Sequence, residues 1–227
     1  MKAILLSAGY GKRLMPLTRH KPKCLMKIKG KILLDIWIKK LVSAGIKDIL
    51  INLHYKKDKV INHIKKHKYK RFISLSFEKN LLGTAKTLIS NYNFYKSHNI
   101  MLIHSDNYCL DNLKEFIISH KKRPTKCIMT MMTFKTDSPK SCGILKINKQ
   151  GVVKKIYEKK KNPPGNLANG AVYILSPELT KQLKNKKYTD FSTQVLPTLI
   201  GKIYTYYTKS VFIDIGTLKN YKKSQLI

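Results

Sequence analysis

The stretch Leu6–Leu25, LSAGYGKRLMPLTRHKPKCL, is the most informative part of the chain. It begins where the apolar run Ala3–Leu6 ends, and that run predicts a buried first strand. Gly9 and Gly11 then allow the backbone to turn tightly and another group to approach it closely. Four cations and two prolines follow at the end of the strand: Lys12, Arg13, Lys21 and Lys23, with Pro16 and Pro22. A glycine turn followed by fixed cations predicts a polyphosphate-binding loop.

Two common phosphate-binding motifs are absent, since there is no Walker A sequence and Leu14 replaces the third glycine of a dinucleotide fingerprint. The stretch instead closely resembles the signature G-x-G-x-R-L-x-P-L-T-x-x-x-P-K of the sugar-1-phosphate nucleotidylyltransferases, without a gap, from Gly9 to Lys23. Lys12 stands where that family often has threonine or serine, and Ser7 and Tyr10 are also unusual.

Strand and helix patterns alternate through the first half of the chain, which predicts a largely parallel sheet with helices on both sides. The expected strands are Ala3–Leu6, Asp48–Leu53, Phe72–Phe77 and Ile100–His104, and the expected helices are Lys31–Ala44, Lys56–His67 and Gly83–Ser90. The resemblance implies the same α/β class, a Rossmann-like mixed, mainly parallel sheet flanked by helices. Ligands of such sheets bind beyond the carboxyl ends of the strands, where the glycine turn and Asp106 both fall.

The second half is richer in strand patterns, at Cys127–Phe134, Cys142–Ile147, Val152–Tyr157, Ala171–Leu175 and Val211–Ile213. Lys159–Asn169 contains two prolines and a glycine and predicts a loop, and Phe191–Ile200 predicts a helix. No linker or repeat is evident, so residues 1–227 are expected to form a single nucleotidyltransferase domain. The C-terminal left-handed β-helix that related enzymes often carry is not expected.

Acids are rare in this chain, which has 12 Asp and Glu against 46 Lys and Arg, so an acid at a motif position is informative. Asp106 follows one expected strand and Asp214 follows another. On the local pattern alone, a turn-forming or helix-capping role for Asp106 would be favoured. The family resemblance implies that the two bind the catalytic Mg²⁺, an ion that prefers one or two carboxylates plus phosphate oxygens.

The resemblance also implies which residues contact the two substrates. The residues expected at the nucleotide are Leu6, Ala8, Gly9, Gly11, Glu78, Gly83 and Thr84. The residues expected at the sugar phosphate are Asn107, Gly143, Glu158, Lys159, Asn169 and Gly170. The family commonly has proline after the Glu–Lys pair, whereas this chain has Lys160, and the lysines at 159–161 could also be a solvated charge run.

Three cations are expected to carry the catalysis. Lys23 and Lys159 would orient the reacting phosphates, and Arg13 would stabilise the departing pyrophosphate. No covalent intermediate is needed, so positioning and charge stabilisation suffice.

The net charge of +34 raises the hypothesis of a nucleic-acid partner. Only four of the basic residues are arginines, the residue preferred for bidentate base and phosphate recognition. The lysines are spread along a chain rich in Ile, Asn and Tyr, as a biased codon composition would produce. We therefore expect no specific nucleic-acid partner, although nonspecific polyanion binding at low salt is expected. A basic surface would also attract anionic substrates.

The four cysteines lack C-x-x-C spacing and predict reduced thiols in place of a zinc site or a disulfide framework. His63 and His67 lie four apart and could bind a metal, but their lysine-rich surroundings favour a solvated helix face. There is no run of 18 apolar residues and no secretion signal, so a cytoplasmic enzyme without a membrane partner is expected.

The implied reaction joins a sugar 1-phosphate to a nucleoside triphosphate, giving a nucleotide sugar and pyrophosphate. The chain looks most like compact single-domain members described as mannose-1-phosphate guanylyltransferases, which implies GTP and mannose 1-phosphate. Uridylyl or cytidylyl transfer to N-acetylmuramate, heptose or another small-molecule phosphate stays open. A non-catalytic nucleotide- or RNA-binding protein is the alternative of another class. The resemblance suggests a homodimer, although a chain without the β-helix lacks a common assembly element.

Overall fold

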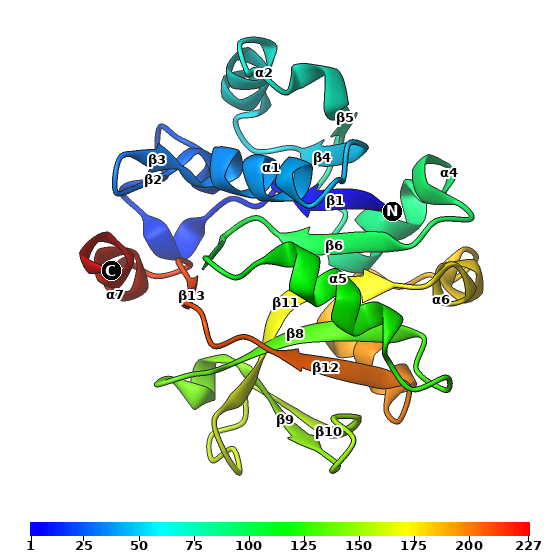
Figure 1. Ribbon diagram of the computed structural model, residues 1–227. Coiled ribbons are helices and arrows are strands. Elements are labelled where there is room, and N and C mark those ends of the chain that lie inside the picture. Colours follow the sequence, from blue (N-terminus) through cyan, green and yellow to red (C-terminus); the bar gives the residue numbers. More distant parts are fainter. The chain divides into compact units, whose positions relative to one another are not determined.

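The computed structural model describes all residues from 1 to 227 (Figure 1). The chain divides into two compact units. The first unit contains Met1–Leu81, Ile103–Leu113 and Ser210–Ile227, and the second contains Leu82–Leu102 and Lys114–Lys209. None of the helices combines the length and the hydropathy that crossing a membrane would require.

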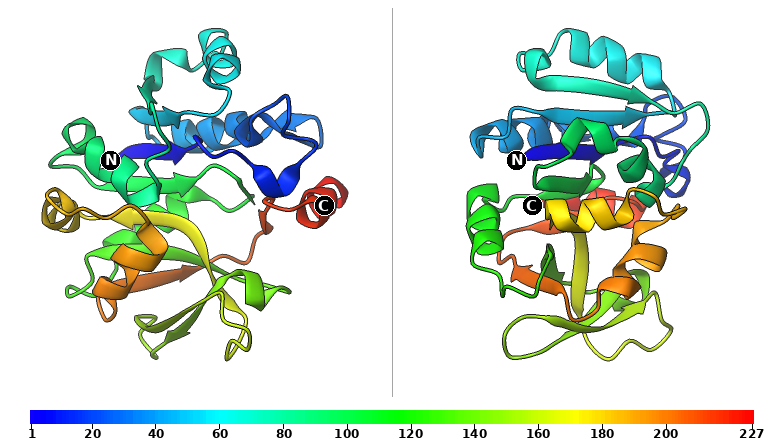
Figure 2. Two further views of the ribbon diagram at one scale, coloured as in Figure 1. Left: turned by 180° about the vertical axis from the view of Figure 1, so that it is seen from behind. Right: turned by 90° about the vertical axis from the view of Figure 1, so that its right-hand side faces the viewer.

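The first unit is built on a parallel sheet of β1 (Lys2–Leu6), β4 (Ile49–Leu53) and β5 (Ile73–Phe77), in the order β1-β4-β5. The three strands lie side by side in each view of Figures 1 and 2. All five residues of β4 are buried, which explains why this strand reads as a nearly continuous apolar run.

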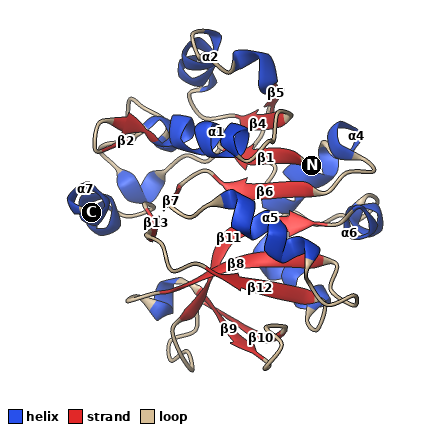
Figure 3. Ribbon diagram, in the orientation of Figure 1, coloured by secondary structure: helices blue, strands red, loops and turns tan.

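Helix α1 (Leu33–Ser43) packs an apolar face inward, with Leu33, Leu34, Trp37, Ile38 and Leu41 buried. Its start was expected at Lys31, but Lys31–Ile32 form the short strand β3, which pairs with β2 (Lys27–Ile28). Gly45, at φ +85°, follows the helix end, a position that favours glycine. Helix α2 (Lys57–Lys65) precedes β5 and buries only Val60 and Ile64 (Figure 3).

The remaining elements of the first unit bring distant parts of the sequence together. Strand β7 (Asn107–Cys109) pairs antiparallel with β13 (Phe212–Asp214), which leads to α7 (Leu218–Leu226). Strand β6 (Ile100–His104) crosses the unit boundary, and just beyond its end the Ser105 N–H donates to the Leu6 carbonyl at 3.2 Å.

The second unit contains a mixed sheet in which β8 (Met129–Lys135) pairs with both β11 (Leu167–Leu175) and β12 (Ile203–Tyr207). Strands β9 (Gly143–Ile147) and β10 (Val153–Glu158) extend it beyond β11. These pairs are antiparallel except β8–β12. The helices are α3 (Thr84–Ser90), α4 (Tyr92–Tyr95), α5 (Leu113–Lys121) and α6 (Pro177–Leu183).

The predicted α/β class is confirmed, with a mixed sheet in which β1, β4 and β5 are parallel and most of the strand pairs of the second unit are antiparallel. The expected helix at Phe191–Ile200 is confirmed, as a π-helix over Phe191–Val195 followed by a 3₁₀ helix over Leu196–Leu199, and Pro197 within it has no N–H to continue an α-helix. One local expectation is wrong. The expected loop Lys159–Asn169 ends earlier, because β11 begins at Leu167, opposite Lys135 of β8. The single domain stays a prediction.

Candidate active site

Thr18, a residue of the same signature, holds the glycine turn in place. Gly11 has φ +66°, and a Cβ there would lie 3.0 Å from Thr18 Cγ2. The Thr18 hydroxyl, which is fully buried, donates to the Gly11 carbonyl at 2.9 Å. No atom lies within 4 Å of a Cβ placed at Gly9, so the space in front of this residue is open. The turn is therefore fixed at Gly11 and open at Gly9.

Two predicted magnesium ligands and one predicted catalytic cation meet at the end of this turn. The β7–β13 ladder places Asp214 opposite Asn107, and the Ile215 N–H donates to the Asp106 carbonyl at 3.1 Å. Lys23 Nζ forms an ion pair with Asp106 Oδ2 and lies 3.7 Å from Asp214 Oδ1. The two carboxylates thus share one cation.

Arg13 reaches the same cluster beside a glycine that sequence reasoning did not select. A Cβ at Gly216 would lie 2.8 Å from Arg13 Nη2, 2.8 Å from Asp214 Oδ1 and 3.1 Å from Lys23 Nζ. The Gly216 N–H donates to Asp214 Oδ1 at 2.7 Å. The signal that could have found this residue was its place two residues after a predicted ligand.

Charge holds Asp106 ionised. Burial by itself would raise the pKa of Asp106, but the Lys23 ammonium and the neighbouring His104 outweigh it and hold that pKa below its usual range. An ionised carboxylate is the form that binds a cation.

A series of buried hydrogen bonds joins the end of β1 to the end of β5. The Ser7 N–H donates to Asn52 Oδ1 at 2.7 Å, and Asn52 Nδ2 donates to Glu78 Oε1 at 2.8 Å. Asn52 is 3% exposed and Glu78 7%, so both groups need these partners. The predicted nucleotide contact Glu78 is therefore held by the middle strand of the sheet.

A second series of hydrogen bonds also ends at Glu78. The hydroxyl oxygen of Tyr10, in the glycine turn, lies 2.9 Å from His54 Nε2, and His54 Nδ1 lies 3.0 Å from the Glu78 carbonyl oxygen. A carbonyl only accepts, so Nδ1 carries a proton, and in the neutral imidazole Nε2 accepts from the Tyr10 hydroxyl. Sequence reasoning selected neither Asn52 nor His54, although a polar Asn inside the apolar run of β4 was a signal.

Three further predicted residues of the first unit have structural partners. Leu6 ends β1, and its carbonyl accepts from the Ser105 hydroxyl at 2.7 Å. Ala8 is 3% exposed, and its carbonyl accepts from the Tyr55 N–H at 3.3 Å. Asn107 is also buried, and its carbonyl accepts from Trp37 Nε1 at 2.8 Å.

In the second unit, Gly83 and Thr84 are fixed by the segment before the π-helical turn. Gly83 has φ +89°, and a Cβ there would lie 2.5 Å from the Thr189 carbonyl oxygen. The Thr84 hydroxyl accepts from the Phe191 N–H at 2.7 Å. A glycine is required at position 83 by both the backbone and the close approach.

Three of the predicted sugar-phosphate contacts also meet in the second unit. Glu158 pairs with Gly143 across the β9–β10 ladder, and a Cβ at Gly143 would lie 2.5 Å from Glu158 Oε2 and 3.8 Å from Asn169 Cβ. Asn169 Nδ2 donates to the Tyr173 hydroxyl at 2.9 Å. Tyr173 is buried and was not among the residues predicted from the sequence. Glycine at 143 thus makes room for the Glu158 carboxylate.

Two predicted residues differ from the expected local structure. Asn169 and Gly170 lie inside β11, where the register shifts, and not before the strand. Lys159 is 69% exposed at its side chain and lies 3.7 Å from Glu158 Oε1. Of the predicted site residues, Lys23, Asp106 and Asp214 lie together in the first unit, and Gly143, Glu158 and Asn169 lie together in the second.

The chain is similar to known proteins along nearly its whole length. A family model described as nucleotidyl transferase matches residues 2–226. The chain is 29% identical over 229 residues to mannose-1-phosphate guanyltransferase 2 of Candida glabrata and 28% identical over 229 residues to mannose-1-phosphate guanyltransferase of Saccharomyces cerevisiae. Each alignment covers 97% of this chain and 63% of the relative, so the chain spans less than two thirds of these curated proteins.

Solved structures share the fold over nearly the whole chain. HddC from Yersinia pseudotuberculosis, in a complex with GMP-PN, is 25% identical with a TM-score of 0.81, and 99% of this chain and 98% of that chain are covered. UDP-glucose pyrophosphorylase complexed with UDP-glucose is 21% identical with a TM-score of 0.83, and the coverage is 99% and 97%. The second likeness supports the fold alone.

Proposed function

The chain belongs to the nucleotidyl transferase family, and we propose that it transfers a nucleoside monophosphate from a nucleoside triphosphate to a sugar 1-phosphate. The products are a nucleotide sugar and pyrophosphate. We propose GTP and mannose 1-phosphate as the substrates and GDP-mannose as the product. Relatives named mannose-1-phosphate guanyltransferase support this choice, and HddC was solved with GMP-PN, a ligand named for the group that would be transferred.

The observation that carries the proposal is the cluster of Lys23, Asp106 and Asp214 beside Arg13. In the reaction an oxygen of the sugar phosphate attacks the α-phosphorus of the triphosphate, and the bond from that phosphorus to the pyrophosphate oxygen breaks. Negative charge develops on the leaving pyrophosphate. Fixed cations at the glycine turn stabilise this charge without reorganisation, which is an effective form of catalysis.

The two aspartates fit a magnesium ion. They share the Lys23 ammonium, so both carboxylates already lie around one positive charge. No group of three or more acidic, histidine or cysteine side chains is arranged as a metal site, and Mg²⁺ requires only one or two carboxylates when phosphates and water complete its shell. When bound, Mg²⁺ would neutralise phosphate charge. Asp106 and Asp214 are the residues that would hold it.

The nucleotide is proposed to lie over the open backbone at Gly9. No atom occupies the Cβ position there, which allows a phosphate or ribose to approach the main chain. Glu78, fixed by Asn52, would accept hydrogen bonds from the base or ribose. Thr84 begins α3, Gly83 precedes it, and the two are the proposed base contacts of the second unit.

The sugar phosphate is proposed to contact the residues gathered around Gly143. Glu158 offers carboxylate oxygens to sugar hydroxyls, and Asn169 is oriented by Tyr173 and by the Ala171 N–H, which donates to Asn169 Oδ1 at 2.8 Å. Lys159, exposed and next to Glu158, is the proposed phosphate contact. The cytoplasmic location and the homodimer stay predictions.

A matrix of pyrophosphate-release assays with Mg²⁺ tests the substrates. It crosses ATP, GTP, CTP, UTP and dTTP with mannose, glucose, N-acetylglucosamine, N-acetylmuramate and heptose 1-phosphates. We expect the highest kcat/KM for GTP with mannose 1-phosphate. A different best pair would replace the substrates and keep the reaction. Absence of release with every pair, together with salt-resistant RNA binding, would contradict the enzymatic proposal and favour the binding protein.

A further inference from the structure

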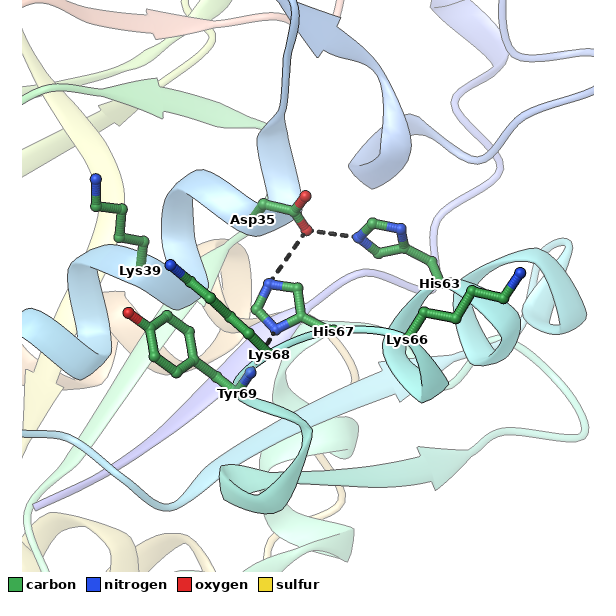
Figure 4. Close-up of a pocket in the computed structure, with 7 residues that line it drawn as sticks. All are labelled: Asp35, Lys39, His63, Lys66, His67, Lys68 and Tyr69. Carbon is green, nitrogen blue, oxygen red and sulfur yellow. Dashed lines mark hydrogen bonds and ion pairs between the residues drawn. The ribbon is translucent and has the colours of Figure 1, made fainter.

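Outside the proposed active site, a pocket of the first unit gathers polar side chains from α1 and from the end of α2 (Figure 4). His63 Nε2 lies 2.5 Å from Asp35 Oδ1, and His67 Nε2 lies 3.6 Å from the same oxygen. These contacts join α2 and the segment after it to α1, so we assign the two histidines to the packing of the helices. The polar group that bears on the proposed reaction lies in the second unit.

Strand β11 has a bulge among the predicted sugar-phosphate contacts. Its register with β8 shifts between Asn169 and Tyr173, and three residues of β11 there stand opposite a single residue of β8. Ala171, in the middle of the bulge, has φ +51°, which is uncommon for a residue with a side chain. Bulges are over-represented next to active sites, where they re-aim a side chain. The side chain that this bulge re-aims is that of Asn169.

The bulge determines how the amide of Asn169 is oriented. The Ala171 N–H donates to Asn169 Oδ1 at 2.8 Å, which fixes the position of the amide oxygen. Asn169 Nδ2 carries two hydrogens and donates one of them to the Tyr173 hydroxyl at 2.9 Å. The other takes part in no hydrogen bond of the structure. Asn169 therefore has a donor left for a ligand.

Tyr173 is a rigid partner for this amide. It is fully buried, and its ring centre lies 5.0 Å from that of Phe191. Burial raises the pKa of Tyr173 above its usual range, while hydrogen bonds with Asn169 and Ser192 act in the opposite direction. The hydroxyl stays protonated, and its oxygen keeps a lone pair for the Asn169 donor. Because the packed ring cannot turn away, it holds the amide in one orientation.

Glu158 supplies the complementary group beside Asn169. A Cβ at Gly143 would lie 2.5 Å from Glu158 Oε2 and 3.8 Å from Asn169 Cβ, so the two side chains flank one point. The Glu158 side chain is 27% exposed, which leaves it accessible to a ligand. A carboxylate only accepts hydrogen bonds, whereas the remaining Asn169 hydrogen only donates. A sugar hydroxyl can satisfy both groups at once, but a ring oxygen or an ionised phosphate oxygen can only accept.

We propose that Tyr173 is a positioning residue that holds Asn169 as a donor, so that the sugar is selected through one hydroxyl that accepts from Asn169 and donates to Glu158. This inference rests on the proposed function, in which Asn169 and Glu158 contact the sugar. Tyr173 acts through Asn169 and not on the substrate. A site built to hydrogen-bond a substrate hydroxyl rejects an analogue that lacks it, because its own polar groups are then left unpaired.

The Tyr173→Phe variant removes this hydroxyl and leaves the ring. We expect the KM for the sugar 1-phosphate to rise by about tenfold and the KM for the nucleoside triphosphate to stay within about twofold. The matched control is Tyr95→Phe, because Tyr95 is 1% exposed in the same unit and its hydroxyl donates to the Leu88 carbonyl at 2.9 Å. This control loses a buried hydrogen bond away from Asn169 and should leave both KM values within about twofold. Equal changes in the two variants would overturn the proposal.

Sugar 1-phosphates that lack one hydroxyl at a time test the selectivity. They are the monodeoxy forms of the sugar 1-phosphate that the unmodified enzyme uses best. We expect one of them to lose about tenfold or more in kcat/KM with the unmodified enzyme. The same form should lose only about threefold or less with Tyr173→Phe, since the two changes disrupt one interaction. Losses that are equal in both enzymes for every form, or no loss with the unmodified enzyme, would contradict the selectivity.

Calorimetric binding gives a readout that does not depend on turnover. We expect Tyr173→Phe to raise the Kd for GDP-mannose by about tenfold and to leave the Kd for GMP within about twofold. If this difference is found but the unmodified protein releases no pyrophosphate with any substrate pair, the proposed reaction fails and the role of Tyr173 stands. If the unmodified protein and the variant bind GDP-mannose equally, the role of Tyr173 fails, whatever the turnover.

Discussion

Asn52 Nδ2 donates to Glu78 Oε1 at 2.8 Å, while Asn52 Oδ1 accepts from the Ser7 N–H at 2.7 Å. One buried side chain of β4 thus joins the strand that precedes the glycine turn to the carboxylate proposed to contact the nucleotide. The middle strand of the sheet sets the spacing between two parts of the proposed nucleotide site.

Replacing Asn52 should weaken nucleotide binding more than sugar-phosphate binding. In Asn52→Ala the buried Glu78 carboxylate loses this donor, and the loss of a hydrogen bond to a charged group costs about 1.5–3 kcal/mol. We expect a KM for GTP raised by about tenfold, a nearly unchanged KM for mannose 1-phosphate, and a lower midpoint in chemical denaturation. The exposed Asn62 of α2 supplies the control variant Asn62→Ala. Equal rises in both KM values would show a merely structural role.

Lys23 should be required for catalysis. The Lys23→Gln variant removes the cation that Asp106 and Asp214 share, so kcat should fall by about 10²–10³-fold. The variant should also raise the pKa of Asp106, because Lys23 is the main charge that lowers it. Steady-state kinetics against the control Lys21→Gln, a neighbouring lysine without an ion pair, measures the effect. A kcat within threefold of the unmodified enzyme would exclude the proposed role of Lys23.

Replacing Gly216 with alanine should leave the stability of the fold unchanged but lower the activity. A Cβ there would lie within 3.1 Å of the ends of Arg13 and Lys23, which are flexible and can move aside. We expect Gly216→Ala to keep its denaturation midpoint and to lose about tenfold or more in kcat/KM. By contrast, Gly83→Ala should unfold more easily, because its Cβ would lie 2.5 Å from a backbone oxygen at φ +89°. Full activity in Gly216→Ala would mean that the cations need no fixed position.

Acid should destabilise the second unit through His120. This residue is 1% exposed, and its Nδ1 lies 2.8 Å from the Thr130 hydroxyl. Burial, aided by the charge of Arg123, lowers the pKa of His120 to about 3 from its ordinary 6.5. Between these values the unfolded chain binds a proton that the folded chain does not, so stability is complete above pH 6.5 and falls as the pH approaches 3.

The slope attributable to His120 is at most about 1.4 kcal/mol per pH unit. Denaturation curves at several pH values should therefore show a shallower acid dependence in His120→Gln than in the unmodified chain. An identical pH dependence in the two proteins would contradict this assignment.

Local patterns predicted the strands β1, β4 and β6 well, because continuous apolar runs report burial directly. The signature also contains Gly11, Thr18 and Lys23, and the structure shows what Thr18 does, since its hydroxyl donates a hydrogen bond to the Gly11 carbonyl. These residues are close in sequence, so their order carries the information.

The features that were missed depend on contacts between distant segments. Gly216 matters only because the β7–β13 ladder brings Asp214 beside Lys23, and no local pattern reports that pairing. The segment Phe191–Ile200 is helical, as its apolar pattern predicts, but the pattern does not distinguish a π-helix and a 3₁₀ helix from an α-helix.

The proposed reaction is tested most directly by ³¹P NMR of GTP and mannose 1-phosphate incubated with Mg²⁺ and the enzyme, beside the Asp106→Asn variant. We expect the triphosphate resonances to give way to those of GDP-mannose and pyrophosphate in equal amounts. We expect the variant to convert less than about a hundredth as much in the same time. Unchanged GTP in the sample with unmodified enzyme would contradict the proposed reaction, and equal conversion by Asp106→Asn would contradict the proposed role of Asp106.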